Sequence, residues 1–221
     1  MPYALYFEGL NDQYVRNNTS AVSIVDTDDF VIEFEWEQDN NSNFGRVLGG
    51  DTIDSRSPRV LFFGNSSTVR LTSGDGTDYE WGASHDLTQR TIWRFERTNG
   101  VLDLYINGAK ISGTKTEAFG SFNMNLIGGN FGNTTNAGLL YYATFIVNGV
   151  VQKDYQPSLS NGTGSVLPDA TGGPSATLIQ FPSDDSQWVF YSTGAAGPET
   201  PINPSVTNLL ATSARLNWEQ G

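Results

Sequence analysis

The chain has 221 residues, of which 38% are hydrophobic and 12% aromatic, enough apolar surface for a folded core and too much for a generally disordered chain. Its 24 acidic and 12 basic side chains give a formal charge of −12, which argues against a nucleic-acid partner and against an anionic membrane surface. The chain has no cysteine, so disulfides, thiolate catalysis and cysteine-based metal sites are excluded.

The start of the chain and its apolar stretches predict neither a secretion signal nor a membrane span. Met1-Pro2-Tyr3 leads directly into a strand pattern, without the basic and apolar regions of a signal peptide. The longest apolar stretch, Leu139 to Val147, is too short to cross a bilayer. We therefore expect no membrane insertion, and a module that belongs to a larger protein.

Alternation of apolar and polar residues with a period of two dominates the chain, and no segment of helical length keeps a 3.6-residue period. The alternation is clearest over residues 30–37, 91–97 and 101–106. The stretch 139–147 is apolar on both faces, which is typical of a central strand. Asn-Gly pairs, which supply the positive φ angles of tight hairpins, lie at Asn99-Gly100, Asn107-Gly108, Asn148-Gly149 and Asn161-Gly162. The sequence therefore predicts an all-β fold.

A change of composition near Gly194 predicts a domain boundary. We expect one domain over residues 1–195, a linker over 196–204 and a short segment over 205–221. The last segment resembles the first two strands of a fibronectin type III domain, and it is too short to fold alone. Its apolar residues are therefore expected to pack on the main domain or on a neighbouring copy: Val206, Leu209, Leu216 and Trp218.

Three segments carry a wider family resemblance. They are Ala4 to Val15, the alternating strand Phe30 to Trp36, and Leu104 to Ile111 with its Asn-Gly turn, followed by Leu126 to Gly129. In this order they resemble the concanavalin A-like, laminin-G-like jelly-roll domain over roughly residues 3–150. The resemblance implies a jelly-roll sandwich of two antiparallel sheets. The residues from Val150 onward are similar to the version of this domain in phage tail or bacterial surface proteins.

The strand over residues 30–37 places three carboxylates, Glu33, Glu35 and Glu37, on one face. Neighbours in such a row lie roughly 6–7 Å apart, a spacing that can hold the nucleophile and the acid/base of a retaining glycosidase. The row also resembles the Glu-x-Asp-x-Glu strand of laminarinase-type hydrolases, which implies Glu33 as nucleophile and Glu37 as acid/base, although Glu35 stands where that family has Asp. The alternative is a solvated face whose like charges are screened by water.

Two loops are candidate calcium sites, because calcium prefers oxygen ligands. Asn11 and Asp12 match the opening motif of laminin-G-like domains, which often bind a structural calcium ion. Asp75 and Asp78 lie in a glycine-bearing loop with oxygen-bearing side chains at close spacing. The alternative is that these aspartates only cap turns.

Aromatic and polar residues in loops are candidates for sugar binding, because a sugar ring has apolar C–H faces and many hydroxyls. One such stretch holds Tyr79, Trp81 and His85. Another holds Asp51, Asp54 and Arg56. Core packing is the alternative for Trp81. The tryptophans within strand patterns are expected in the core: Trp36, Trp93 and Trp188.

These patterns favour a non-catalytic carbohydrate-binding or adhesion domain, outside the cell or on a virion, with a glycan or cell-surface polysaccharide as partner and calcium as the expected cofactor. The site is expected on loops at one end of the sandwich or on the sheet face that carries the glutamates. The alternatives are a glycoside hydrolase and a structural spacer that forms oligomers within a tail or surface fibre.

Overall fold

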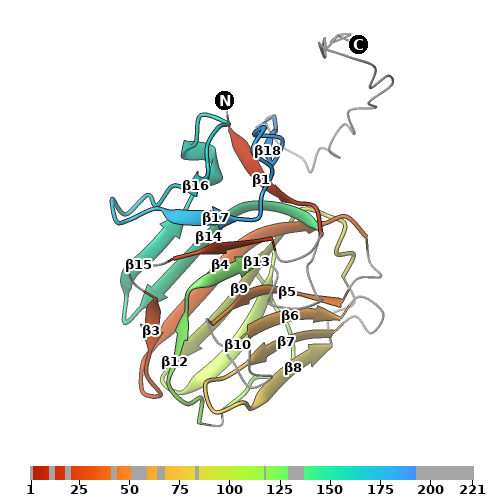
Figure 1. Cartoon of the computed structure of the whole chain (residues 1–221). Coiled ribbons are helices and arrows are strands. Elements are labelled where there is room, and N and C mark those ends of the chain that lie inside the picture. The colour runs from red at the N-terminus through yellow and green to blue at the C-terminus, as the bar shows by residue number, and fades with distance from the viewer. Residues whose placement is uncertain are drawn as a thin grey trace.

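The computed structural model describes residues 2–9, 13–17, 21–40, 44–50, 59–63, 68–82, 85–116, 118–128 and 137–192. The expected linker and fibronectin-like segment lie outside these residues, and so does the expected packing of Val206, Leu209, Leu216 and Trp218. Within them the chain forms two antiparallel sheets that pack face to face (Figure 1). The predicted all-β jelly-roll sandwich is confirmed. No helix in this part of the chain has the length and apolar character needed to cross a membrane.

The first sheet contains the longest strands, and we call it the long-stranded sheet. Its strands lie in the order β11-β10-β9-β4-β14-β1-β18, and β15 pairs with the part of β14 that β1 leaves free. Their bounds are β1 (Tyr3–Phe7), β4 (Phe30–Gln38), β9 (Thr91–Thr98), β10 (Val101–Ile106), β11 (Ala109–Lys110), β14 (Gly138–Val147), β15 (Val150–Tyr155) and β18 (Trp188–Phe190). The strands predicted over 30–37, 91–97, 101–106 and 139–147 are thus confirmed, and β14 is central in its sheet.

The second, short-stranded sheet has the order β16-β17-β2-β13-β5-β6-β7-β8. Its strands are β2 (Tyr14–Arg16), β5 (Phe44–Gly49), β6 (Arg59–Phe63), β7 (Thr68–Thr72), β8 (Asp78–Gly82), β13 (Leu126–Gly128), β16 (Val166–Leu167) and β17 (Ala176–Ile179). A separate two-stranded pair, β3 (Val22–Ile24) with β12 (Phe122–Met124), and a 3-10 helix, η1 (Pro157–Leu159), complete the fold.

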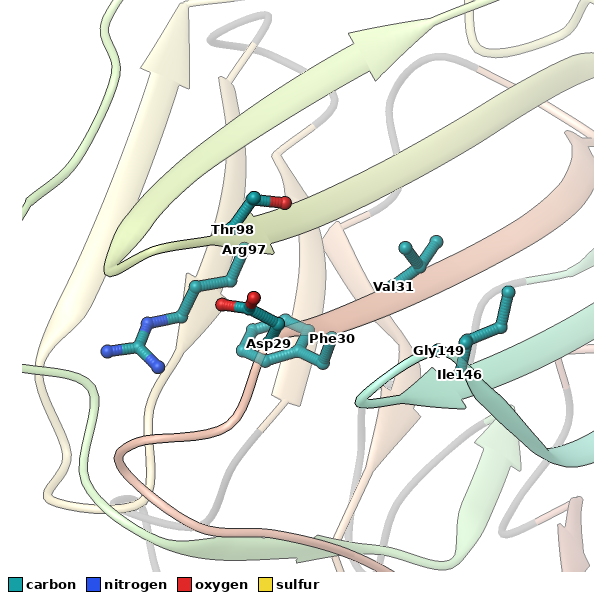
Figure 2. A pocket seen from close by; sticks show the side chains of 7 residues that line it. All are labelled: Asp29, Phe30, Val31, Arg97, Thr98, Ile146 and Gly149. Atoms are coloured by element: carbon teal, nitrogen blue, oxygen red, sulfur yellow. The ribbon is translucent and has the colours of Figure 1, made fainter.

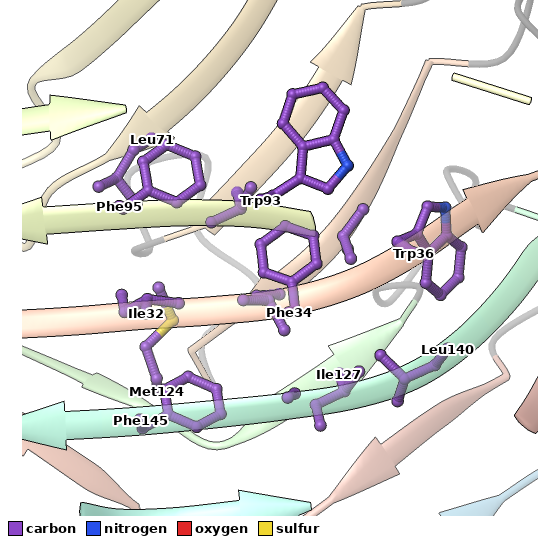
Figure 3. Close-up of a cluster of buried hydrophobic side chains, with 14 of the residues drawn as sticks. Ile32, Phe34, Trp36, Leu71, Trp93, Phe95, Met124, Ile127, Leu140 and Phe145 are labelled. Carbon is purple, nitrogen blue, oxygen red and sulfur yellow. The ribbon is translucent and has the colours of Figure 1, made fainter. Parts of the chain in front are cut away.

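Alternation along the long strands supplies the core between the sheets. The inward side chains of β4 are at most 2% exposed, and they are Phe30, Ile32, Phe34 and Trp36. Neighbouring strands and the opposite sheet add the other side chains of the cluster in Figure 3, among them Leu71, Trp93, Phe95, Leu140 and Phe145. Each such side chain contributes about 1.5–3 kcal/mol by leaving water. The predicted core positions of Trp36, Trp93 and Trp188 are confirmed.

Tight turns connect neighbouring strands of the long-stranded sheet. Asn99, Asn107 and Asn148 have φ angles of 51°, 49° and 49°, and the glycine after each also has a positive φ. Two successive residues with positive φ match the right-handed twist of a hairpin, which is why Asn-Gly is preferred there. At the fourth predicted pair only Gly162 has a positive φ, of 75°, and the ring of Tyr3 packs against this glycine.

A buried ion pair links β15 to the segment that follows η1. Lys153 Nζ lies 3.0 Å from Asp169 Oδ2, and the two side chains are 6% and 0% exposed. The other oxygen of Asp169 accepts hydrogen bonds from the backbone of Asp154 and from the backbone and hydroxyl of Thr171. Burial alone would raise the pKa of Asp169, but the hydrogen bonds from Lys153 and Thr171 outweigh it and hold that pKa below its ordinary value.

Replacing Asp169 by asparagine leaves the Lys153 ammonium buried without a counter-ion. We expect Asp169→Asn to lower the free energy of unfolding by about 3–5 kcal/mol at neutral pH, measured by urea denaturation. Because the carboxyl pKa is depressed in the folded state, its stabilisation is present above the ordinary pKa of 3.8 and is lost as pH falls through the lower folded value. A double variant, Lys153→Met with Asp169→Asn, should recover most of the loss. An Asp169→Asn variant with an unchanged free energy of unfolding would contradict a stabilising role for this ion pair.

Candidate functional site

The outer face of the long-stranded sheet, opposite the core, carries the three predicted carboxylates. Glu33, Glu35 and Glu37 alternate along β4 with its core residues, as the sequence pattern predicts. In the sheet register Glu33 lies between Arg94 of β9 and Thr144 of β14. The row therefore faces outward from the middle of the sheet, with polar side chains of both neighbouring strands beside it.

Each of these carboxylates has its own partner. Glu33 accepts hydrogen bonds from the Tyr142 hydroxyl at 2.9 Å and from Arg94 Nη1 at 3.2 Å. Glu35 holds the guanidinium of Arg90 with two hydrogen bonds, of 2.6 and 3.0 Å. Glu37 accepts the hydroxyl of Tyr141 at 2.7 Å. The repulsion within the row is thus offset by specific donors and cations, in addition to screening by water.

A register shift in β14 brings both tyrosines to the carboxylates. The pairing of β14 with β4 is irregular between Leu140 and Tyr142, so the strict alternation of faces is interrupted there. Two consecutive residues, Tyr141 and Tyr142, consequently both reach carboxylates of the outer face. Bulges of this kind commonly redirect a side chain beside a functional site. A period-two reading of the sequence places these two rings on opposite faces, and so it misses their joint contribution.

Arg90 contacts two aromatic rings. Its guanidinium carbon lies 4.0 Å from the centre of the Tyr141 ring and 4.9 Å from that of Tyr191. The two rings meet edge to face at 5.0 Å. Tyr191 follows β18, and its backbone N–H bonds to the carbonyl of Pro2. The stacked arrangement and the bidentate bond to Glu35 leave Arg90 little rotational freedom.

Burial and charged neighbours together shift the pKa values of the phenols, Glu37 and Arg90. It raises the pKa of Tyr142, and the bond to Glu33 raises it further. It raises the pKa of Tyr141 in the same way, with Glu37 as the second cause. Burial also raises the pKa of Glu37, although the bond from Tyr141 opposes this. Burial would lower the pKa of Arg90, but Glu35 outweighs it and the pKa is raised. At neutral pH the phenols therefore stay protonated as donors and Arg90 stays charged.

A further tyrosine–carboxylate pair extends this surface. Tyr6 of β1 donates its hydroxyl to Asp39 at 2.8 Å, and the register places Tyr6 beside Leu139, which lies beside Glu37. We call the whole surface the tyrosine–carboxylate face. It consists of Tyr6, Glu33, Glu35, Glu37, Asp39, Arg90, Arg94, Tyr141, Tyr142 and Tyr191.

The aromatic residues proposed from the loops lie elsewhere. Tyr79 and Trp81 are 3% and 1% exposed and belong to the core, where Tyr79 stacks on Phe119 and donates its hydroxyl to a backbone carbonyl. Burial leaves neither ring a face for a sugar, and the core alternative for Trp81 is the one that the structure supports. His85 bonds to Thr91 at 2.6 Å, and burial lowers its pKa. The other loop, Asp51, Asp54 and Arg56, lies outside the described residues.

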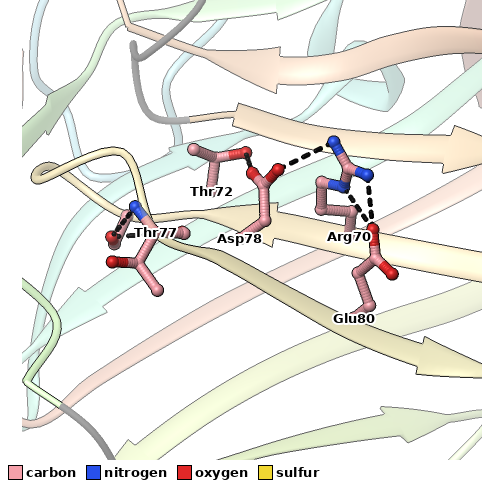
Figure 4. Close-up of polar contacts among 6 residues, drawn as sticks. Arg70, Thr72, Thr77, Asp78 and Glu80 are labelled. Carbon is pink, nitrogen blue, oxygen red and sulfur yellow. Dashed lines mark hydrogen bonds and ion pairs between the residues drawn. The ribbon is translucent and has the colours of Figure 1, made fainter.

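In the loop proposed for calcium, both carboxylate oxygens of Asp78 and one of Asp75 accept hydrogen bonds. Asp78 forms an ion pair with Arg70 at 2.8 Å and accepts the hydroxyl of Thr72 at 2.6 Å, as Figure 4 shows. Asp75 accepts hydrogen bonds from Ser73 and from the backbone of Thr77, which is the arrangement of a capped turn. The described residues contain no group of three or more acidic or histidine side chains that could hold a metal ion, and Asn11 and Asp12 lie outside them.

Arg90→Lys tests how much the planar guanidinium contributes to the stability of the fold through its contacts on this face. Lysine keeps the charge but loses the bidentate bond and most of the stacking, so we expect a loss of about 1 kcal/mol in the free energy of unfolding. Arg94→Lys is the matched control, because Arg94 bonds to Glu33 and Glu96 and contacts no ring among the residues that the structure describes. It should change the free energy of unfolding by less than about 0.5 kcal/mol. Equal losses in the two variants would show that stacking contributes nothing.

Comparison with known proteins gives distant structural likeness. No family model matches the sequence, and no curated protein matches it. A pentraxin from Limulus polyphemus is 12% identical, with a TM-score of 0.49 over 65% of this chain and 75% of that one. Domains LG4-5 of the mouse laminin α1 chain are 10% identical, with a TM-score of 0.47 over 66% and 41%. The sialyllactose-bound CBM40 of a Ruminococcus gnavus sialidase is 16% identical, with a TM-score of 0.44 over 66% and 92%.

Proposed function

We propose that this domain is a non-catalytic carbohydrate-binding module and that the glycan lies on the tyrosine–carboxylate face. The observation that carries the proposal is the joint presence of four tyrosines, four carboxylates and two arginines on one continuous outer face. A sugar-binding site needs aromatic rings and charged side chains, because the C–H faces of a sugar pack on the rings and its hydroxyls bond to charged acceptors and donors.

The internal bonding of this face supports binding by preorganisation. Tyr141, Tyr142 and Tyr191 are already fixed by Glu37, Glu33 and Arg90, so a ligand would order few further side chains. Tyr6, Tyr142 and Tyr191 are only partly buried, so their rings are available to a ligand. The surplus of negative charge disfavours phosphate-rich ligands and leaves neutral glycans as the best-matched class.

The setting that we propose is a larger phage tail or bacterial surface protein, outside the cell or on the virion, where such a module would attach its parent to a polysaccharide. Calcium remains a proposal for Asn11 and Asp12, on the strength of the sequence motif alone. A purely structural spacer, assembled as an oligomer in a fibre, is the alternative if no glycan binds.

A glycan-array screen of the full chain, run with calcium and again with EDTA, tests this function. We expect calcium-independent binding that falls at least about tenfold, or 1.4 kcal/mol, in Arg90→Ala and in Tyr142→Ala. Arg70→Ala is the matched control, because Arg70 also bonds to carboxylates, but on the short-stranded sheet. Binding that EDTA abolishes would move the site towards Asn11 and Asp12. The absence of any binding would favour the spacer.

Glycoside hydrolysis is kept as the second function because of one observation, the raised pKa of Glu37, which suits a general acid. Glu33, the corresponding nucleophile, already accepts bonds from Tyr142 and Arg94. We therefore expect no release of reducing ends from any glycan that binds. Release by the wild-type chain that Glu33→Gln and Glu37→Gln both abolish would establish the hydrolase instead.

A further inference from the structure

A notch opens on the long-stranded sheet where three of its strands begin or end. Its volume is about 130 Å³, and Figure 2 shows the residues that line it. They come from the start of β4, the end of β9 and the hairpin between β14 and β15: Asp29, Phe30, Val31, Arg97, Thr98, Ile146 and Gly149. A cavity of about 150 Å³ with apolar walls admits a molecule the size of benzene, so this notch has room for one small substituent of a larger ligand.

The walls of the notch are mainly apolar, and two of their side chains, Val31 and Ile146, face outward. Val31 and Ile146 are partners in the register of β4 and β14, and both are partly buried. In Figure 2 their side chains point to the same side of the sheet as that of Thr98. Arg97 extends away from them and donates to the carbonyl of Asp28 at 2.7 Å, so its charge is not directed at the two apolar side chains.

The rim of the notch supplies one fixed acceptor and one hydroxyl. Asp29 Oδ1 accepts the backbone N–H of Asn99 at 2.7 Å, and the backbone N–H of Asp29 donates to Asn148, which together hold this carboxylate in place. Within the part of the chain that the structure describes, no donor bonds to its second oxygen, Oδ2, or to the hydroxyl of Thr98. Both groups can therefore bond to a ligand.

The notch is continuous with the tyrosine–carboxylate face. The pair Val31–Ile146 is the next outward-facing pair along the strands after Glu33–Thr144, a step of about 7 Å. From Val31 to Glu37 the strand covers about 20 Å. An extended oligosaccharide on this face would thus place its end, or a branch, at the notch.

We propose that the notch is a subsite for the acetamido group of a neutral N-acetylhexosamine, and this rests on the proposed function of the neighbouring face. The methyl group packs between Val31 and Ile146, the amide N–H donates to Asp29, and the carbonyl oxygen accepts the hydroxyl of Thr98. This combination of an apolar wall, an acceptor and a donor matches the three parts of an acetamido group. The Asp29 carboxylate disfavours sugars that carry a carboxylate of their own.

The test uses NMR titration of the full chain with N-acetylglucosamine and with N-acetylgalactosamine, with the methyl signals of Val31 and Ile146 as the readout. Glucosamine, fucose and glucuronic acid are the comparison ligands. We expect the N-acetylated sugars to shift these signals and to bind at least tenfold more tightly than the other three. If fucose binds as tightly as the N-acetylated sugars, the notch accepts any methyl-bearing sugar and the acetamido assignment is wrong. If glucuronic acid binds most tightly, the assignment to a neutral ligand is wrong.

Two variants separate this subsite from the face beside it. Thr98→Trp, at an exposed rim position, should fill the notch and reduce affinity for N-acetylated oligosaccharides at least tenfold. Val150→Trp is the control, because Val150 is 59% exposed on the β14–β15 hairpin beside the notch but does not line the notch. Asp29→Asn keeps an acceptor for the backbone N–H of Asn99 and replaces Oδ2 by a donor. It should therefore lower the affinity for N-acetylated ligands and leave the affinity for other sugars unchanged.

The outcomes distinguish the two proposals. If Arg90→Ala weakens oligosaccharide binding and Thr98→Trp leaves it unchanged, the notch is not a subsite, and the proposal of a binding site on the tyrosine–carboxylate face stands. N-acetylated monosaccharides could also bind at Val31 and Ile146 while no oligosaccharide binds through Arg90 and Tyr142. That result would support the notch as a binding site and contradict the proposed site on the tyrosine–carboxylate face. Equal effects of Thr98→Trp and Val150→Trp on affinity would also contradict the proposal that the notch is a subsite.

Discussion

Backbone pairing between β4 and β14 runs along the whole of β4, from Phe30 opposite Val147 to Gln38 opposite Gly138. Both sides of the molecule depend on it. Inward, the two strands place Phe30, Phe34, Trp36 and Phe145 in the core. Outward, they carry the carboxylate row and the two tyrosines that bond to it. The approach is so close at one end that a Cβ on Gly138 would lie 2.3 Å from the carbonyl oxygen of Glu37, so only glycine fits there.

The irregularity in this pairing gives the outer face its chemical character. A regular strand alternates, and it would present only one of Tyr141 and Tyr142 to the carboxylates. The register shift after Leu140 lets both phenols donate outward while Leu140 and Ala143 remain in the core. Loss of regular pairing at that point is offset by the hydrogen bonds of the two hydroxyls to Glu33 and Glu37.

The chain carries a large negative charge, and cations compensate two carboxylates of the tyrosine–carboxylate face. Arginines from the neighbouring strand and its approach, Arg94 and Arg90, compensate Glu33 and Glu35, and a phenol serves Glu37. The four carboxylates of this face still outnumber its two arginines, so the surface is polar and ordered and keeps a negative surplus. A surface of this kind matches the neutral, hydroxyl-rich ligand that we propose better than an anion. On the other sheet, Asp78 and Glu80 of the edge strand β8 pair with Arg70 of β7.

The sequence by itself determined the fold class, the four longest predicted strands, the turns at three Asn-Gly pairs and the outward position of the glutamate row. These features depend on local rules, because side chains alternate along a strand and Asn-Gly prefers positive φ. Tertiary structure alone decided which aromatic residues are accessible. Tyr79 and Trp81 enter the core because β8 faces inward there, and the tyrosines near Glu33 come from a strand over 100 residues later in the chain. Contacts between distant strands, a bulge in one of them and a notch between three strand ends depend on how the sheet is assembled, and no local pattern records that assembly.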